Sequence, residues 1–439
     1  MKITARFNWK VFVLIVLAAS AALSLPGQND PAQKGATALH KASDGQLTVQ
    51  FEERTRWEEQ YGVKFGKAVN QQDMLSRIRI GMQYRPSSWL TISAMGQDAR
   101  APFYGKPAPG TVRDTMDLQE SWLSAATETK LFNFSFGRRM LDYGETRVIG
   151  SPQWSNTSRT YDYARAEYAS KKMILDGLMV SPVIVQQDSF NTPELGNRIW
   201  GAYAVFPKIS RGSSIDAYAL RHSENKIGGW TGTGTLGTNT FGIRFYGPLP
   251  NHFNYSLEGI GQTGHQGLPN QRAYAWFAGV TRPATVFTLP LNLSLEYKEA
   301  SGSRYGSSHS ATYDQLSPAN HDKFGHMDQF GWRNLKTLKS LETLKLNKYA
   351  SLNVMYTDEY LFSASDALYA SNGTQLAIST KGAYGTRVGQ ELDSFMTFSA
   401  GNHTFYAGFG HFFKGQFIDK ATPGINPRYF YIAQQYIIK

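Results

Sequence analysis

From about residue 46 to the end of the chain, short segments alternate apolar and polar residues, and the connections between them are alternately tight and long. A transmembrane β-barrel requires this rhythm, because one face of each strand meets lipid, the other faces water, and the backbone groups must pair with neighbouring strands. A helical membrane bundle is excluded, since nothing after Leu25 forms an apolar run of the roughly 20 residues that a spanning helix needs. The sequence predicts an all-β protein with a single transmembrane antiparallel barrel.

The direction in which each face points follows from its charges. In one segment Ile78, Ile80 and Met82 alternate with Arg77 and Arg79. An arginine on the lipid face costs about 2–4 kcal/mol at the membrane midplane, so the arginines should face the lumen. The same alternation recurs in residues 132–138 and 240–246.

Eighteen candidate strands can be counted, an even number, as single-chain outer-membrane barrels require. The long connections 139–160, 301–333 and 357–387 follow odd strands, and short turns follow even ones, which places both termini on the short-turn, periplasmic side. The Leu and Lys spacing of residues 336–348 suits a helix as well as a strand. The predicted strands are 46–61, 73–84, 90–100, 116–126, 132–138, 161–168, 173–187, 198–206, 214–221, 238–246, 254–262, 271–282, 291–300, 334–342, 347–356, 388–399, 403–412 and 430–438.

The N-terminal segment has the features of a secretory signal peptide. Lys2, Arg6 and Lys10 precede an apolar core at 11–18, and the small residues at 19–21 offer a cleavage site. The alternative, a membrane anchor, is too short. We therefore expect a signal peptide at 1–24, a polar leader at 25–45 and a barrel at 46–439 that is exported to the outer membrane of a Gram-negative-type cell.

The charge of the chain favours an anionic solute. Removing the three cations of the signal peptide from the formal net charge of +11 leaves +8. Nucleic acid is an improbable partner for an exported barrel, whereas cations on a low-dielectric wall would concentrate anions. The structural alternative is that the inward arginines pair with inward acids such as Glu52, Glu120, Glu391 and Asp393 and brace the wall.

Several ordered motifs give a more specific indication. Residues 136–150 read FGRRMLDYGETRVIG and are followed by WSNTSRTYD at 154–162 and by Arg165. This series resembles the signature of the alginate export family of outer-membrane barrels. Further matching pieces lie at 96–100, 300–302, 312–316, Pro318, His321, Gly325, Asp328, Asn334, 388–393 and 408–415, so the resemblance covers nearly all of the mature chain.

The resemblance implies a monomeric eighteen-strand barrel whose arginine-lined lumen passes an anionic polysaccharide or oligosaccharide, an alginate-like polyuronate. We also expect contact with outer-membrane lipid and with periplasmic export or uptake proteins. The alternative functions are a general or small-anion-selective porin and a barrel with a closed lumen that serves adhesion or structure. The residues expected along the substrate pathway are Arg54, Arg56, Arg77, Arg79, Arg100, Arg138, Arg139, Arg147, Arg159, Arg165, Arg244, Asp98, Glu391 and Asp393.

The connection after the fifth strand, residues 139–160, gives the most specific prediction about substrate-binding residues. Folded into the channel, it would place Arg147 and Arg159 at a constriction, where guanidinium groups can bind carboxylates in a bidentate manner. The alternative is that Arg147, Asp142 and Glu145 join the connection to the wall by salt bridges.

Other chemistry is not indicated by the sequence. It lacks the motifs of serine hydrolases, zinc proteases and phosphate-binding loops, and it has no cysteine for soft metals. We therefore expect no enzymatic activity and no cofactor. His321, Asp322, His326 and Asp328 lie close together in one long connection, where they either bind a cation or, as is usual for polar residues in loops, are solvated or form turns; no metal site is assigned.

Overall fold

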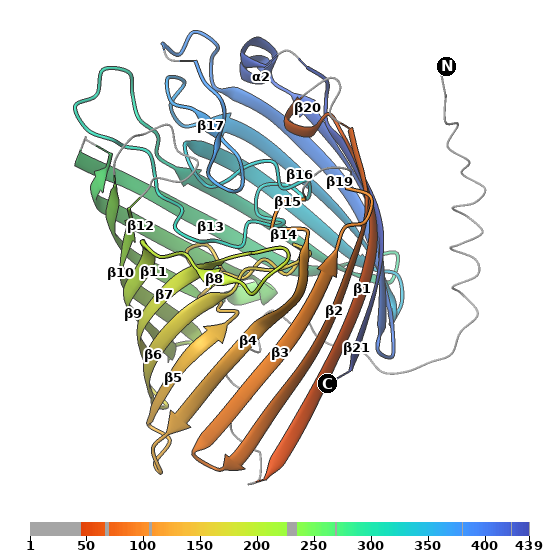
Figure 1. The fold of residues 1–439 in the computed structure, drawn as a ribbon. Coiled ribbons are helices and arrows are strands. Elements are labelled where there is room, and N and C mark those ends of the chain that lie inside the picture. The colour runs from red at the N-terminus through yellow and green to blue at the C-terminus, as the bar shows by residue number, and fades with distance from the viewer. Residues whose placement is uncertain are drawn as a thin grey trace.

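The computed structural model describes residues 45–65, 70–104, 108–225, 235–267, 270–379, 381–422 and 424–438. They form a closed antiparallel β-barrel in which each strand pairs with its neighbours in chain order (Figure 1). The first strand, β1, pairs with the last, β21, through partners that run from Phe51 and Ile438 to Tyr61 and Arg428. The predicted signal peptide and nearly all of the predicted leader lie outside the described residues.

Eighteen strands make up the barrel wall, as predicted. The 336–348 segment contributes a strand because its backbone pairs with both neighbours, so sheet pairing decides what the side-chain spacing left open. The strands are β1 (Gln46–Tyr61), β2 (Asn70–Ser87), β3 (Leu90–Arg100), β4 (Asp114–Ala126), β5 (Phe132–Arg139), β6 (Tyr161–Ala169), β7 (Ile174–Ile184), β9 (Asn197–Ser210), β10 (Ser213–Glu224), β11 (Leu236–Pro248), β12 (Asn254–Gln266), β13 (Asn270–Val286), β14 (Leu289–Ala300), β15 (Leu335–Lys345), β16 (Ala350–Leu361), β19 (Arg387–Ala400), β20 (His403–Lys414) and β21 (Arg428–Ile438).

The predicted alternation of faces is present in the wall. On β2, Ile78, Ile80 and Met82 are 45, 54 and 54% exposed, whereas Arg77 and Arg79 are 1 and 3% exposed. The apolar side chains of β5 and β11 are exposed in the same way. The barrel therefore presents an oily outer surface and keeps these arginines inside.

The two rims differ in the length of their connections. Tight turns such as 88–89, 211–212, 287–288 and 401–402 join strands at one rim. At the other rim lie the long connections, including one between β14 and β15 and one between β16 and β19. The latter contains a small hairpin of β17 (Leu368–Tyr369) and β18 (Gln375–Ala377). The remaining short elements are β8 (Thr192–Pro193), the six-residue helix α2 (Gln416–Ala421) and the 3-10 turns η4 (Val63–Phe65) and η5 (Pro250–His252).

The hydrophobic core lies within the barrel at the long-loop end. It combines inward residues of the wall, such as Tyr203 and Tyr218, with Ile149, Tyr313 and Trp332 from the long connections. A side chain from a connection can be buried in this way only when the connection folds inward. No helix among the described residues is both long enough and apolar enough to cross a bilayer.

The assignment of the two faces is tested by placing one charge on each. Ile80→Arg puts a guanidinium on the outer face near the middle of β2 and should lower the free energy of unfolding in lipid vesicles by about 2–4 kcal/mol. Gln83→Arg, three residues further on the inner face, should change it by less than about 0.5 kcal/mol. Urea titrations of the two variants would measure both values, and equal losses would contradict the assignment.

Candidate functional site in the barrel lumen

Two connections fold into the lumen and touch each other there. We call residues 140–160 the first inner loop and residues 301–334 the second inner loop. Ile149 and Ser317 form a parallel β-bridge between them. The N–H of Gly150 donates to the carbonyl of Ser317 at 2.9 Å, and the N–H of Ser317 donates to the carbonyl of Val148 at 3.0 Å. The two loops thus form one unit inside the barrel.

The first inner loop is bound on one side by arginines of β1 and β2. Arg54 donates to the carbonyls of residues 153, 154 and 155 at 2.9–3.2 Å. Arg56 donates to the carbonyl of Trp154 at 2.7 Å, and Arg77 to that of Ser155 at 3.0 Å. Arg79 reaches the carbonyl of Thr157 at 3.1 Å. The inward arginines therefore hold a loop that crosses the lumen.

The same wall carries fewer acids than arginines. Glu52 makes ion pairs with Arg77 and, at 3.6 Å, with Arg79, and Glu58 pairs with Arg56 at 2.5 Å. All these side chains have the inward parity of the β1–β2 ladder. Asp73 of β2, which lies opposite Glu58 in the ladder, is a third buried acid, so four guanidinium groups share this part of the wall with three carboxylates.

The other end of the first inner loop is fixed to the opposite wall. Glu145 pairs with Arg147 at 2.6 Å and with Arg244 of β11 at 2.9 Å. Arg147 also pairs with Glu258 of β12 at 3.3 Å and lies 3.4 Å from the ring centroid of Phe277. Because the Arg147 guanidinium is buried among these partners, its contacts are those of the structural alternative, a loop joined to the wall by salt bridges.

The remaining inward arginines have local partners. Arg165 pairs with Glu167 and with Asp176, both at 3.5 Å. Arg139 stacks over the ring of Trp122 at 4.3 Å. Arg159 of the first inner loop donates to the carbonyl of Pro318 at 2.9 Å, so it adds a further link between the two loops.

Three residues of the expected pathway do not face the lumen. Asp98 pairs in register with the lipid-facing Ile78, and Arg100 binds Asp98 at 2.9 Å on the same outer face. Arg138 has the parity of the exposed Phe136 and pairs with Asp162 at 2.7 Å. Strand parity decides which face a side chain takes, and it places these three residues outside, so the prediction that they line the pathway is wrong.

The second inner loop is bound by acidic and basic side chains of the neighbouring wall strands β14, β15 and β19. Glu391 accepts the N–H of Met327 at 2.8 Å, and Asp393 accepts that of His326 at 3.2 Å. Lys298 donates to the carbonyl of Lys323, and Lys339 donates to that of Asp322 at 2.5 Å. Glu391 and Asp393 therefore bind N–H groups of the loop backbone, and Lys298 and Lys339 bind its carbonyl groups.

Trp154 is the contact point between the loops and the wall. Its ring stacks on His321 at a centroid distance of 4.5 Å and meets the edge of Tyr431 at 4.9 Å. The Arg56 guanidinium lies 4.1 Å from the same ring. A single side chain of the first inner loop thus contacts the second inner loop, β1 and β21.

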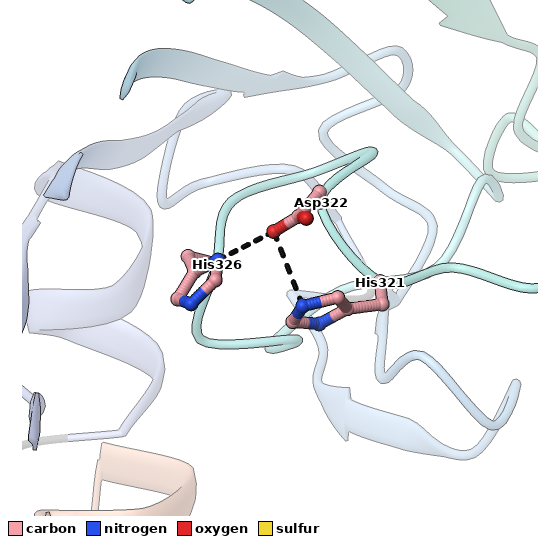
Figure 2. A group of neighbouring side chains, drawn as sticks. All are labelled: His321, Asp322 and His326. Carbon is pink, nitrogen blue, oxygen red and sulfur yellow. Dashed lines mark hydrogen bonds and ion pairs between the residues drawn. The ribbon is translucent and has the colours of Figure 1, made fainter. Parts of the chain in front are cut away.

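The four polar residues of the second inner loop are brought together, as their spacing suggested. Asp322 lies between the two imidazoles (Figure 2), at 3.3 Å from His321 and 2.5 Å from His326. Asp328 lies 2.8 Å from His321. Burial alone would raise the pKa of the Asp322 carboxyl, but the two imidazoles outweigh it and hold that pKa below its usual range.

Towards the short-turn rim, the inward positions become largely uncharged. The ladder places Gln50, Gln83 and Ser93 on the inner face there. Across the barrel the inward set includes Asn292, Thr343, Asn353, Thr397, Thr404 and Gln435. Hydroxyl and amide groups of this kind can both donate and accept hydrogen bonds.

Sequence reasoning gave no role to Trp154, Lys298, Lys339 or Tyr431. For the two lysines a signal was available, since each has inward parity in its strand, as Arg77 has. For the aromatic residues there was none, because their role depends on which loop folds onto which wall.

The contact role of Trp154 predicts a loss of protection in both loops when its ring is removed. Trp154→Ala should raise amide hydrogen exchange in residues 140–160 and 318–328 about tenfold or more, since aromatic and cation–π contacts are worth about 0.5–2 kcal/mol each. Trp200→Ala, at an exposed position of β9, is the matched control. Equal exchange in the two variants, measured by mass spectrometry, would count against this role.

The ion pairs of Glu145 with Arg147 and Arg244 predict how docking of the first inner loop depends on pH. Burial would raise the pKa of Glu145, but Arg147 and Arg244 lower it to about 2. The stabilisation is therefore present at neutral pH and is lost only as the pH falls through about 2. Glu145→Gln should release the loop at pH 7. Because the chain has no cysteine, a spin label on Pro152→Cys reports loop mobility, and an unchanged spectrum would refute the link.

The family model described as alginate export matches residues 45–431. Among solved structures, Pseudomonas aeruginosa OccK8 (OprE) has a TM-score of 0.62 at 9% identity, covering 90% of this chain and 99% of that one. OccD3 (OpdP) of the same organism has 0.63 at 10%, with 94 and 95% covered. P. aeruginosa OpdK with vanillate has 0.60 at 8%, with 89 and 98% covered. No curated protein matches the chain.

Proposed function

The chain belongs to the alginate export family of outer-membrane channels, and on that basis we propose that its lumen passes an anionic polysaccharide or oligosaccharide of the alginate-like polyuronate type. One observation carries the proposal: the surplus of cations on the inner face of β1 and β2, where Arg54, Arg56, Arg77 and Arg79 outnumber the acids Glu52, Glu58 and Asp73.

The hydrogen bonds of these arginines do not cancel their charge. A loop carbonyl satisfies an N–H donor, but it is a dipole and leaves the unit positive charge in place. The field of that charge extends into the lumen, and the low-dielectric wall focuses it. Bracing the loop and attracting anions are therefore compatible roles for one side chain.

The burial of the same guanidinium groups decides how they act on a solute. Arg54, Arg56, Arg77 and Arg79 are at most 5% exposed, so they attract a polyanion through their field rather than by direct bidentate contacts. In this proposal the solute makes its direct contacts with the uncharged polar residues nearer the short-turn rim, whose side chains can hydrogen-bond the hydroxyl groups of a sugar. Weak, repeated contacts of this kind favour conduction over retention.

We propose a monomeric channel, which is compatible with the β1–β21 pairing because the wall closes without a second copy. In this proposal residues 1–24 direct export as a signal peptide, and periplasmic proteins supply or receive the sugar.

The alternative is a porin for small anions. It is favoured by the two inner loops, which cross the lumen and narrow the passage, and by the printed partner of one similar barrel, OpdK, which is vanillate, a small carboxylate. Both functions need the same positive field, so the size of the solute separates them.

The role of the β1–β2 cations is tested by neutralising two of them. Arg77→Gln with Arg79→Gln should lower the anion-to-cation permeability ratio at least twofold in planar bilayers. Arg77→Lys with Arg79→Lys keeps the charge, removes the planar fork and should retain selectivity. Heat-modifiable electrophoretic mobility shows that each variant has folded. An unchanged reversal potential in the glutamine pair would contradict the proposal.

The solute class is tested by current block. Oligouronates should reduce the wild-type current at micromolar to millimolar concentration, and a neutral oligosaccharide of equal length should block far less. Block by small carboxylates without block by oligouronates would support the small-anion porin instead. No conductance at all would refute both functions.

A further inference from the structure

We propose that His321, Asp322 and His326 form a binding site for a divalent metal ion of the zinc class inside the barrel. The inference goes beyond the proposed transport function and does not depend on the solute. It rests on how these three side chains and their neighbours are arranged, one ring on each side of the carboxylate (Figure 2).

The three groups present one ligand atom each to a common point. His321 Nε2 lies 3.3 Å and His326 Nδ1 2.5 Å from the same oxygen of Asp322, and the three atoms lie within 4.8 Å of one another. Tetrahedral zinc with bonds of about 2.1 Å separates its ligand atoms by about 3.4 Å. Small rotations of the carboxylate and one ring therefore suffice to admit the ion.

The outer nitrogen of each imidazole has a partner, as in known metal sites. His321 Nδ1 lies 2.8 Å from an oxygen of Asp328, and His326 Nε2 lies 2.8 Å from the hydroxyl of Tyr431. Metal-bound histidines almost always give their second ring N–H to a carboxylate, a carbonyl or a similar acceptor, which fixes the tautomer and the ring orientation. Here both rings are fixed with the other nitrogen turned towards Asp322.

The donor set selects the class of metal. Two imidazole nitrogens and one carboxylate oxygen suit zinc and similar divalent transition metals, whereas calcium and magnesium prefer oxygen ligands only. The Asp322 side chain is 42% exposed, so water can supply a fourth ligand. The nearby carboxylates of Asp328 and Asp393 add negative charge around the site.

The position of the site gives the metal a structural consequence. His321 stacks on Trp154, and His326 contacts Tyr431 of β21, so both ligands belong to the contact between the two inner loops and the wall. A bound ion would cross-link the turn that holds these two rings. Metal binding should therefore slow amide exchange in residues 318–328.

Calorimetric titration of the full-length barrel in detergent, prepared without a polyhistidine tag, tests the proposal with Zn²⁺ as the probe. We expect one ion per chain, at least tenfold weaker binding in Asp322→Asn and in His326→Gln, and about 10–100-fold weaker binding in Asp328→Asn. His309→Gln, an exposed histidine of the same loop, should bind as the wild type does.

The wild-type titration alone can overturn the proposal, so it stays testable if a variant fails to fold. Absence of a stoichiometric site in the wild type would refute it, as would equal affinity in the Asp322→Asn and His309→Gln variants when both show the heat-modifiable mobility of a folded barrel. Tighter binding of Ca²⁺ than of Zn²⁺ would also refute it, because the two imidazoles would then not be ligands.

Discussion

The structure depends on one constraint: a backbone that crosses hydrocarbon must satisfy all of its N–H and C=O groups within itself. In this chain the β1–β21 pairing satisfies that constraint, because each of the eighteen wall strands then has a neighbouring strand on both sides. Closure fixes the parity of each strand, and parity fixes which side chains meet lipid and which face the lumen. The placement of Arg77 inside and Ile78 outside is thus a consequence of the ladder.

Charges inside the barrel then need partners, and the two inner loops supply them. On β1 and β2 the partners are mostly carbonyls, which leave the positive charge in place. Across the barrel the partners are acids: Arg244 of β11 pairs with Asp216 and Glu145, and Arg147 of the first inner loop pairs with Glu145 and Glu258. The lumen is therefore asymmetric, with a local surplus of arginines on the β1–β2 wall and arginines paired with acids on the opposite wall. That asymmetry follows from which loop residues reach which strand.

Much of this could be predicted from the sequence, because strand position and face depend on local alternation. The eighteen strands, the two unequal rims and the inward arginines of β1, β2, β6 and β11 follow from a period of two and the cost of a charge in lipid. Asp98, Arg100 and Arg138 were misplaced because motif similarity was followed where parity should have decided. The burial of Arg147 and the role of Trp154 depend on contacts between residues far apart in the chain, and alternation carries no information about those.

The central claim is the proposal that the surplus of arginines on the β1–β2 wall makes the channel favour anions. The most direct test is the zero-current potential of the wild-type protein in a planar bilayer separating concentrated from dilute potassium chloride. The account predicts that the dilute side becomes negative, because chloride crosses faster than potassium. A dilute side that becomes positive, or a potential near zero, would contradict it.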